Sequence, residues 1–182
     1  MRNLIYVFIV FLFSGCITAK YSKTDYPDPF EFNRVDSVSG SKNELYVRAH
    51  EWVAKSFVNA NEVIQMNDKD AGKLIAKGIM TSDVPLGAMV GTAHYQISFT
   101  ISIDVKQDKY RVSMKNYTLV SGRVSGGTGN PVFFEYNTDL SGSKHPSTMY
   151  PKAWANVKGD CYYTTKELLK SLKSAMHNSD EF

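Results

Sequence analysis

The sequence is poor in the residue types that build reactive centres. Its 182 residues include two cysteines and four histidines. No Gly-x-Ser-x-Gly elbow is present, and no Gly-Lys-Ser/Thr follows the glycine-rich stretch 126–129. The histidines do not have the paired spacing on one element that a metal site needs. They are His50, His94, His145 and His177. We therefore expect no catalytic residues, no metal and no cofactor.

A strong charge of one sign is also missing. Lysine and arginine number 21 against 18 acidic residues, which gives a formal net charge of +3. A protein that binds nucleic acid through the phosphate backbone shows a basic patch or stripe, and none is visible here. There is also no polybasic run of the kind that binds anionic lipid head groups. We therefore expect no nucleic-acid partner.

Long apolar runs are absent except at the N-terminus. Leu4–Phe13 is ten residues of unbroken apolar sequence after the basic Arg2, and Ser14 and Gly15 follow it. A transmembrane helix needs about 20 residues, so this run is too short to span a bilayer. A basic start, a short apolar core and small residues before a cut are the parts of a secretory signal peptide. Residues 1–15 are thus predicted to be removed on export.

The cysteine after Ser14-Gly15 resembles the lipobox of bacterial lipoproteins. This resemblance implies that Cys16 is acylated and holds the chain on a membrane of the cell envelope, at the outer membrane or the periplasmic face. The alternative is ordinary cleavage after Ala19, which would release a soluble exported form beginning at Lys20. Cys161 would have no intrachain partner if Cys16 carries lipid, and we expect a buried small hydrophobic residue there.

The mature chain reads as one domain on a short tether. Residues 16–28 are polar and lack apolar periodicity, residues 29–178 are expected to form a single domain, and 179–182 a tail. A capping box, Ser41 with Glu44, starts the first helix. The strict alternation from Ala93 to Val105 predicts a long strand with one buried and one wet face. Before this strand we expect a first strand from Phe30 to Val38 with a bulge near Asn33, a strand pair at 62–66 and 73–81, and a loop at 83–91. After it we expect a strand from Tyr110 with a bulge near Asn116, and then a long loop at 121–163 that contains an edge strand at 132–136. The last helix is expected to start at the capping box Thr164–Glu167.

Three segments resemble one bacterial family: Glu44-Leu45-Tyr46, Glu51–Phe57 and Asp68–Gly78. The family is a domain of unknown function with a TATA-binding-protein-like fold, found in exported proteins and lipoproteins. The resemblance implies an α+β fold in the order strand, helix, four strands, helix, with both helices on one face of a curved antiparallel sheet. It supplies no catalytic residues. DNA binding is not implied, because the wet face of the long strand lacks the basic side chains and apolar wedges of minor-groove binders.

Two features of the sequence remain as candidate binding surfaces. One is the sheet face that the helices would leave uncovered, with the candidate binding residues His94, Gln96, Ser98, Thr100 and Ser102. The other is a group of aromatic residues in the glycine-rich stretch: Phe133, Phe134, Tyr136, Tyr150 and Trp154. Exposed together, they would form an apolar interaction patch. We expect a binding or assembly module for an envelope protein or glycan; the alternative is an envelope hydrolase with a site built from 121–163.

Overall fold

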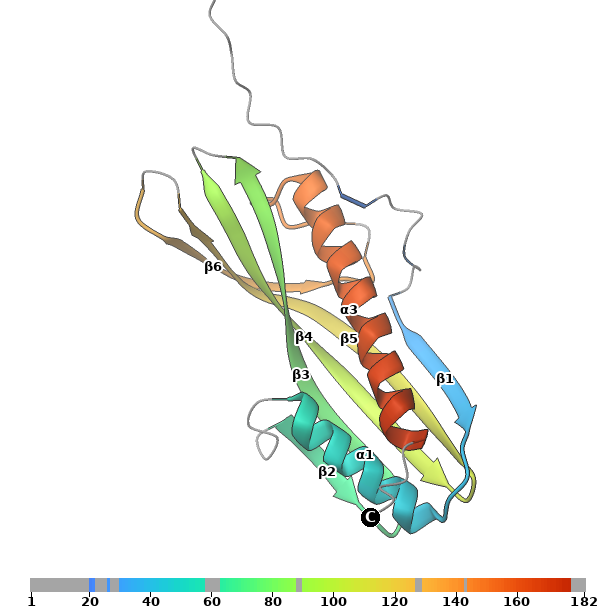
Figure 1. Cartoon of the computed structure of the whole chain (residues 1–182). Coiled ribbons are helices and arrows are strands. Elements are labelled where there is room, and N and C mark those ends of the chain that lie inside the picture. Colours follow the sequence, from blue (N-terminus) through green and yellow to red (C-terminus); the bar gives the residue numbers. More distant parts are fainter. Residues whose placement is uncertain are drawn as a thin grey trace, which may run out of the picture.

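The computed structural model describes residues 20, 21, 26, 30–57, 63–87, 90–126, 129–142 and 144–177. These form six strands and two helices (Figure 1). The elements in chain order are β1 (Phe32–Ser37), α1 (Lys42–Ser56), β2 (Ile64–Asp68), β3 (Lys73–Gly87), β4 (Gly91–Lys106), β5 (Lys109–Ser125), β6 (Val132–Asp139) and α3 (Pro151–His177). Neither described helix has the length and apolar character needed to cross a membrane.

The strands form one antiparallel sheet in the order β1-β5-β4-β3-β2, with β6 added to β5. Both β1 and β6 pair with the same edge of β5, because β1 pairs with residues 109–114 and β6 with residues 118–124. The long strands β3, β4 and β5 therefore run through the whole sheet (Figure 1). One end of the sheet carries β1 and β2, and the other end carries β6.

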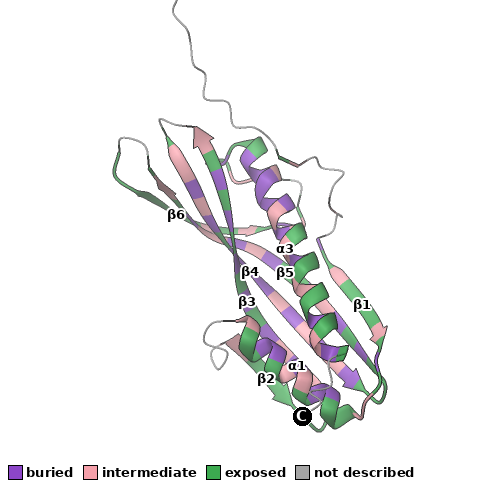
Figure 2. Cartoon of the chain, in the orientation of Figure 1, coloured by how far each residue is buried: buried purple, intermediate pink, exposed green. Residues whose placement is uncertain are grey.

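Both helices pack on one face of the sheet (Figures 1 and 2). On β3 the residues with even numbers from Leu74 to Val84 are buried, while the odd-numbered residues between them face outward. The alternation on β4 is the same, with Phe99 and its alternate neighbours in the core. We call the face turned away from the helices the open face. The predicted α+β fold, with a curved antiparallel sheet and two helices on one side, is confirmed.

Several local predictions are also confirmed. The Ser41 side chain accepts from the Glu44 backbone amide, and the Glu44 side chain accepts from the Ser41 backbone amide, so the capping box is complete. The carboxylate of Glu44 has a lowered pKa because the Ser41 backbone amide donates to it. Asn116 has a φ of 57°, and the β4–β5 register shifts opposite it, which is the expected bulge.

The predicted long loop at 121–163 is wrong at both ends, because strand β5 continues to Ser125 and α3 already begins at Pro151. The edge strand expected inside it at 132–136 is confirmed as β6, which occupies Val132–Asp139 and pairs with β5. Because α3 begins at Pro151, the capping box at Thr164–Glu167 is not a helix start. Thr165 lies inside α3, fully buried, with its hydroxyl bonded to the Tyr117 hydroxyl at 2.9 Å. Proline is well suited to the first turn of a helix, and here it was misread as a loop residue.

Two shorter predictions are corrected as well. The loop expected at 83–91 is strand up to Gly87, because Asp83, Val84 and Pro85 continue the pairing of β3 with β4. The bulge expected near Asn33 is absent: β1 pairs residue by residue with β5 from Phe32 to Ser37.

The N-terminal residues that the structure describes contact α3. The Lys20 backbone amide donates to Asn156 Oδ1 (2.6 Å), and the Tyr21 hydroxyl donates to Asp160 Oδ1 (3.0 Å). The other oxygen of Asp160 accepts from Ser82 Oγ on β3 at 2.7 Å. The Tyr21 ring lies against Gly159, where any Cβ would overlap it. Part of the expected 16–28 tether is thus held on the helix.

Candidate functional site

Two rows of side chains cross the open face near the end of the sheet that carries β6. The strand registers place Asp83 of β3 opposite His94 of β4, His94 opposite Arg123 of β5, and Arg123 opposite Phe133 of β6. The second row is built in the same way from Thr81, Gln96, Ser121 and Glu135. Strands lie about 4.8 Å apart and alternate residues about 6.8 Å apart, so the rows cover roughly 14 by 7 Å.

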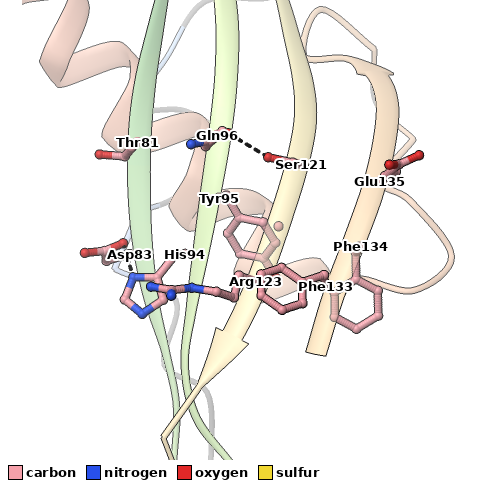
Figure 3. A pocket seen from close by; sticks show the side chains of 11 residues that line it. Thr81, Asp83, His94, Tyr95, Gln96, Ser121, Arg123, Phe133, Phe134 and Glu135 are labelled. Carbon is pink, nitrogen blue, oxygen red and sulfur yellow. Dashed lines mark hydrogen bonds and ion pairs between the residues drawn. The ribbon is translucent and has the colours of Figure 1, made fainter. Parts of the chain in front are cut away.

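These rows line an open hollow of about 650 Å³ (Figure 3). We call it the open-face hollow; its lining is completed by Tyr95, Gly122 and Phe134. Gly122 lies close to two aromatic rings, because a Cβ there would be 2.9 Å from Tyr95 Cδ1 and 3.0 Å from Tyr136 Cε2. The volume of the open-face hollow is within the range of about 300–1,000 Å³ for small-molecule sites.

A chain of hydrogen bonds runs along one edge of the hollow. His94 Nδ1 lies 2.8 Å from Asp83 Oδ1, and His94 Nε2 lies 2.9 Å from Ser125 Oγ. In the neutral imidazole the carboxylate accepts from Nδ1–H, and Nε2 accepts from the serine hydroxyl. Acid, histidine and serine thus follow one another as in a nucleophilic triad. The acid is open to solvent, however, because the Asp83 side chain is 63% exposed.

Arg123 is the cation in the middle of the hollow. Figure 3 shows its side chain extending from β5 toward His94, with the Phe133 ring on its other side. Among the residues that the structure describes, no carboxylate forms an ion pair with this guanidinium. Phe133 is 73% exposed. Aromatic residues and arginine are both enriched in the interfaces of protein complexes, so this part of the hollow is a candidate contact surface.

The second row contributes polar groups without a net positive charge. The Ser121 hydroxyl donates to Gln96 Oε1 at 2.8 Å, which orients the glutamine amide. Thr81 and Glu135 complete the row at its two ends and are exposed. The hollow therefore combines one unpaired cation, one exposed ring, and several hydroxyl, amide and carboxylate groups.

Only two of the five candidate residues on β4 line the hollow. These are His94 and Gln96. Ser98 is buried, and Thr100 and Ser102 lie further along the strand and are half-buried. Sequence reasoning missed Asp83, which was placed in a loop, and Arg123 and Ser125, which were placed in the long loop. Strand pairing brings them beside His94, and no local pattern announces that pairing.

The aromatic group from 133 to 154 does not form one patch. Phe133 lines the hollow, Trp154 is a buried residue of the first turn of α3, and Tyr150 is exposed just before that helix. Phe134 and Tyr136 are stacked on each other with ring centroids 6.2 Å apart. Packing on the domain thus accounts for Trp154, whereas Phe133 stays available to a ligand.

Cys161 lies in the core side of α3 and is 1% exposed, as expected. Burial raises the pKa of its thiol far above the ordinary value, so the reactive thiolate does not form at neutral pH. Within the described part of the chain, no group of three or more His, Cys, Asp or Glu side chains could hold a metal ion. Cys16 and its proposed lipid lie outside the described residues.

A smaller hollow of about 210 Å³ lies at the opposite end of the sheet and includes Tyr110 and Arg111. Its arginine is already paired, because Arg111 donates to Asp104 Oδ2 at 3.0 Å. The open-face hollow is therefore the stronger candidate for a ligand.

Comparison with known proteins agrees with this architecture. Residues 32–119 match the model of the family described as a domain of unknown function (DUF4468) with TBP-like fold. A crystal structure of a DUF4468 family protein from Bacteroides ovatus has a TM-score of 0.57 and 13% sequence identity, covering 89% of this chain and 96% of that chain.

A TBP-like protein from Parabacteroides distasonis has a TM-score of 0.54 at 12% identity, covering 83% of this chain and 94% of that chain. At such identities these likenesses show the fold. No curated protein matches the chain.

Proposed function

We propose that this protein is an exported, lipid-anchored binding module of the cell envelope, and that its partner, a glycan, occupies the open-face hollow. The observation that carries the proposal is that an Arg123 guanidinium without an ion pair and an exposed Phe133 ring line the same hollow of about 650 Å³. The anchor rests on the N-terminal sequence, with Cys16 directly after the apolar run and Ser14-Gly15.

The anchor is tested by intact mass of the mature protein. Cleavage before Cys16 with added acyl chains is expected, and Cys16→Ser should remove both. Two or more chains are needed for stable anchoring, because a single chain holds a protein only marginally. A soluble product beginning at Lys20 would show that the protein is secreted after cleavage at Ala19 and is not anchored. An uncut, unmodified precursor in the cytoplasm would refute export.

Binding is tested with the mature protein in detergent and purified envelope glycan fractions. Arg123→Ala should lower the bound fraction, because it removes the cation at the centre of the hollow. Lys115→Ala is the matched control: Lys115 is an exposed cation on the open face of the same strand, outside the hollow. Equal binding by the two variants would show that the hollow is not the site.

A second function, an envelope hydrolase, is favoured by the Asp83–His94–Ser125 hydrogen-bond chain. Ser125 would be the nucleophile and His94 its base. We rank this function lower because the exposed Asp83 carboxylate is screened by water and holds the imidazole weakly. A fluorophosphonate probe decides between the two. Labelling of Ser125 that disappears in His94→Ala would establish the hydrolase, and an unlabelled Ser125 would exclude serine hydrolysis.

A further inference from the structure

We infer that the ligand of the open-face hollow is a sugar acid, a saturated ring that carries one carboxylate and several hydroxyl groups. This inference rests on the proposed function and names the class of glycan that the hollow takes. It follows from three properties of the described residues: a single unpaired cation, acidic groups that limit the charge of the ligand, and an exposed ring that faces the same space.

The unpaired cation calls for an anion. The Arg123 guanidinium is planar and presents its N–H donors as a fork, which matches the two oxygens of a carboxylate. Arg111 on the same strand shows the contrast, since its guanidinium donates twice to Asp104 Oδ2, at 3.0 and 3.3 Å. Arg123 has no such partner among the described residues, and a ligand carboxylate would occupy the equivalent position.

The acidic groups around the hollow restrict the ligand to a single negative charge. Asp83 and Glu135 stand at the ends of the two rows, and both line the hollow. The hydrogen bond from His94 engages Asp83, whereas Glu135 has no ion pair among the described residues. A dianionic phosphate would be repelled by Glu135, whereas ligand hydroxyl groups can donate to it. One carboxylate with neighbouring hydroxyls therefore fits better than a phosphate.

The exposed ring and the polar row fit the body of a sugar. Phe133 lies directly across the strand pair from Arg123, whose side chain extends away from it toward His94, so a ligand that contacts both would span the hollow between them (Figure 3). The C–H face of a saturated sugar ring packs on an aromatic ring. Gln96, Ser121 and Thr81 supply amide and hydroxyl groups next to it. The two rows, roughly 14 by 7 Å, have the dimensions of a short oligosaccharide.

The test uses pairs of ligands that differ only in charge. Calorimetric titration of the mature protein in detergent compares oligogalacturonate with its methyl ester, and does the same for glucuronate and mannuronate oligomers. At least one acid should bind about tenfold or more tighter than its ester, the size expected for hydrogen bonds to a charged group. Raising the salt concentration should reduce this preference, because the site is open to solvent.

Variants assign the roles of the side chains. Arg123→Ala should remove the preference for the acid, and Arg123→Lys should restore part of it because the charge returns without the fork. Phe133→Ala should weaken acid and ester by the same factor. Lys115→Ala should bind as the unaltered protein does. These side chains are exposed, so unchanged melting temperatures are expected and verify the fold of each variant.

Equal affinity for acid and ester, or no binding of any acid in the panel, would overturn the inference. Tighter binding of a phosphorylated sugar, or of a peptide carboxyl terminus, would overturn it as well, since Glu135 and the polar row would then have been misread. These failures differ from failure of the proposed function. The function stands if Arg123→Ala alone releases envelope glycan, whatever the uronate result.

Discussion

Replacing Gly159 by alanine should reveal the contact between the N-terminal segment and α3. Gly159 lies in the middle of the helix with ordinary helical backbone angles, and it is buried. An added Cβ would lie 2.7 Å from Tyr21 Cε2 and still closer to two other atoms of the ring. No other neighbour is nearer, so the ring of Tyr21 is what the new methyl group would displace.

Two opposing effects set the magnitude. Alanine in place of glycine inside a helix stabilises it by about 0.5–1 kcal/mol. Displacing Tyr21 removes its hydrogen bond to Asp160 and its stacking on Tyr163, whose ring centroid is 5.2 Å away. Each interaction contributes about 1 kcal/mol, and freeing the segment returns about 1–2 kcal/mol of backbone entropy per residue. The net effect of Gly159→Ala on the whole protein should thus be near zero.

The stabilisation of the helix by alanine at position 159 should become measurable once the Tyr21 ring is removed. In a Tyr21→Ala background, Gly159→Ala should raise the free energy of unfolding by about 1 kcal/mol, because only the helix term remains. Urea unfolding of the four proteins, followed by circular dichroism, gives the coupling energy. Tyr150→Ala is the control background, since Tyr150 is an exposed tyrosine that precedes α3 and is not among the atoms nearest to a Cβ at Gly159. Equal stabilisation in both the natural and the Tyr21→Ala backgrounds would refute the contact.

Four further outcomes are expected. The Cys161 thiol should resist iodoacetamide in the native protein and react within minutes in urea, because burial raises its pKa and blocks access. Ser41→Ala should lower the unfolding free energy by about 1 kcal/mol, measured by denaturant titration, through loss of the helix cap. Gly78→Ala should destabilise the fold by about 1–3 kcal/mol and lower its melting temperature, since the new Cβ would lie 2.5 Å from Phe99 Cζ. Burial raises the pKa of Tyr95 from 10.0 to about 12. The stability that the buried neutral phenol contributes is therefore complete below pH 10 and is lost as the pH rises toward 12. The free energy of unfolding measured at pH 9 and 11.5 should show this loss, and Tyr95→Phe should make the loss smaller.

The elements that the sequence predicted correctly are those governed by local physics. The Ser41–Glu44 capping box acts within one helical turn, and the alternation along β4 follows from burial of one strand face. The Asn116 bulge is visible in the sequence as a break in the alternation along β5, which starts at Tyr110. Each of these signals is contained in a short window, so neighbours in the sequence suffice to read it.

The errors have a common cause as well. The stretch 121–163 contains the end of β5 and the start of α3, yet its glycines and prolines resemble those of a loop. The edge strand expected at 132–136 is present as β6, which pairs with the edge of β5 that β1 leaves free. A second capping-box pattern at Thr164 was overridden because Thr165 is bonded to Tyr117 in the core.

The sequence by itself determined the α+β class, the first helix, the central strand with its two faces, and the burial of Cys161. Its N-terminal pattern also carries the prediction of export, through residues that act in linear order on the export machinery. Only the tertiary structure decided the candidate site. Asp83, His94, Arg123 and Phe133 come from four strands, and antiparallel pairing alone places them in one row. The row requires three strand registers to be correct together, because a slip of one residue in any strand would turn its side chain to the other face of the sheet.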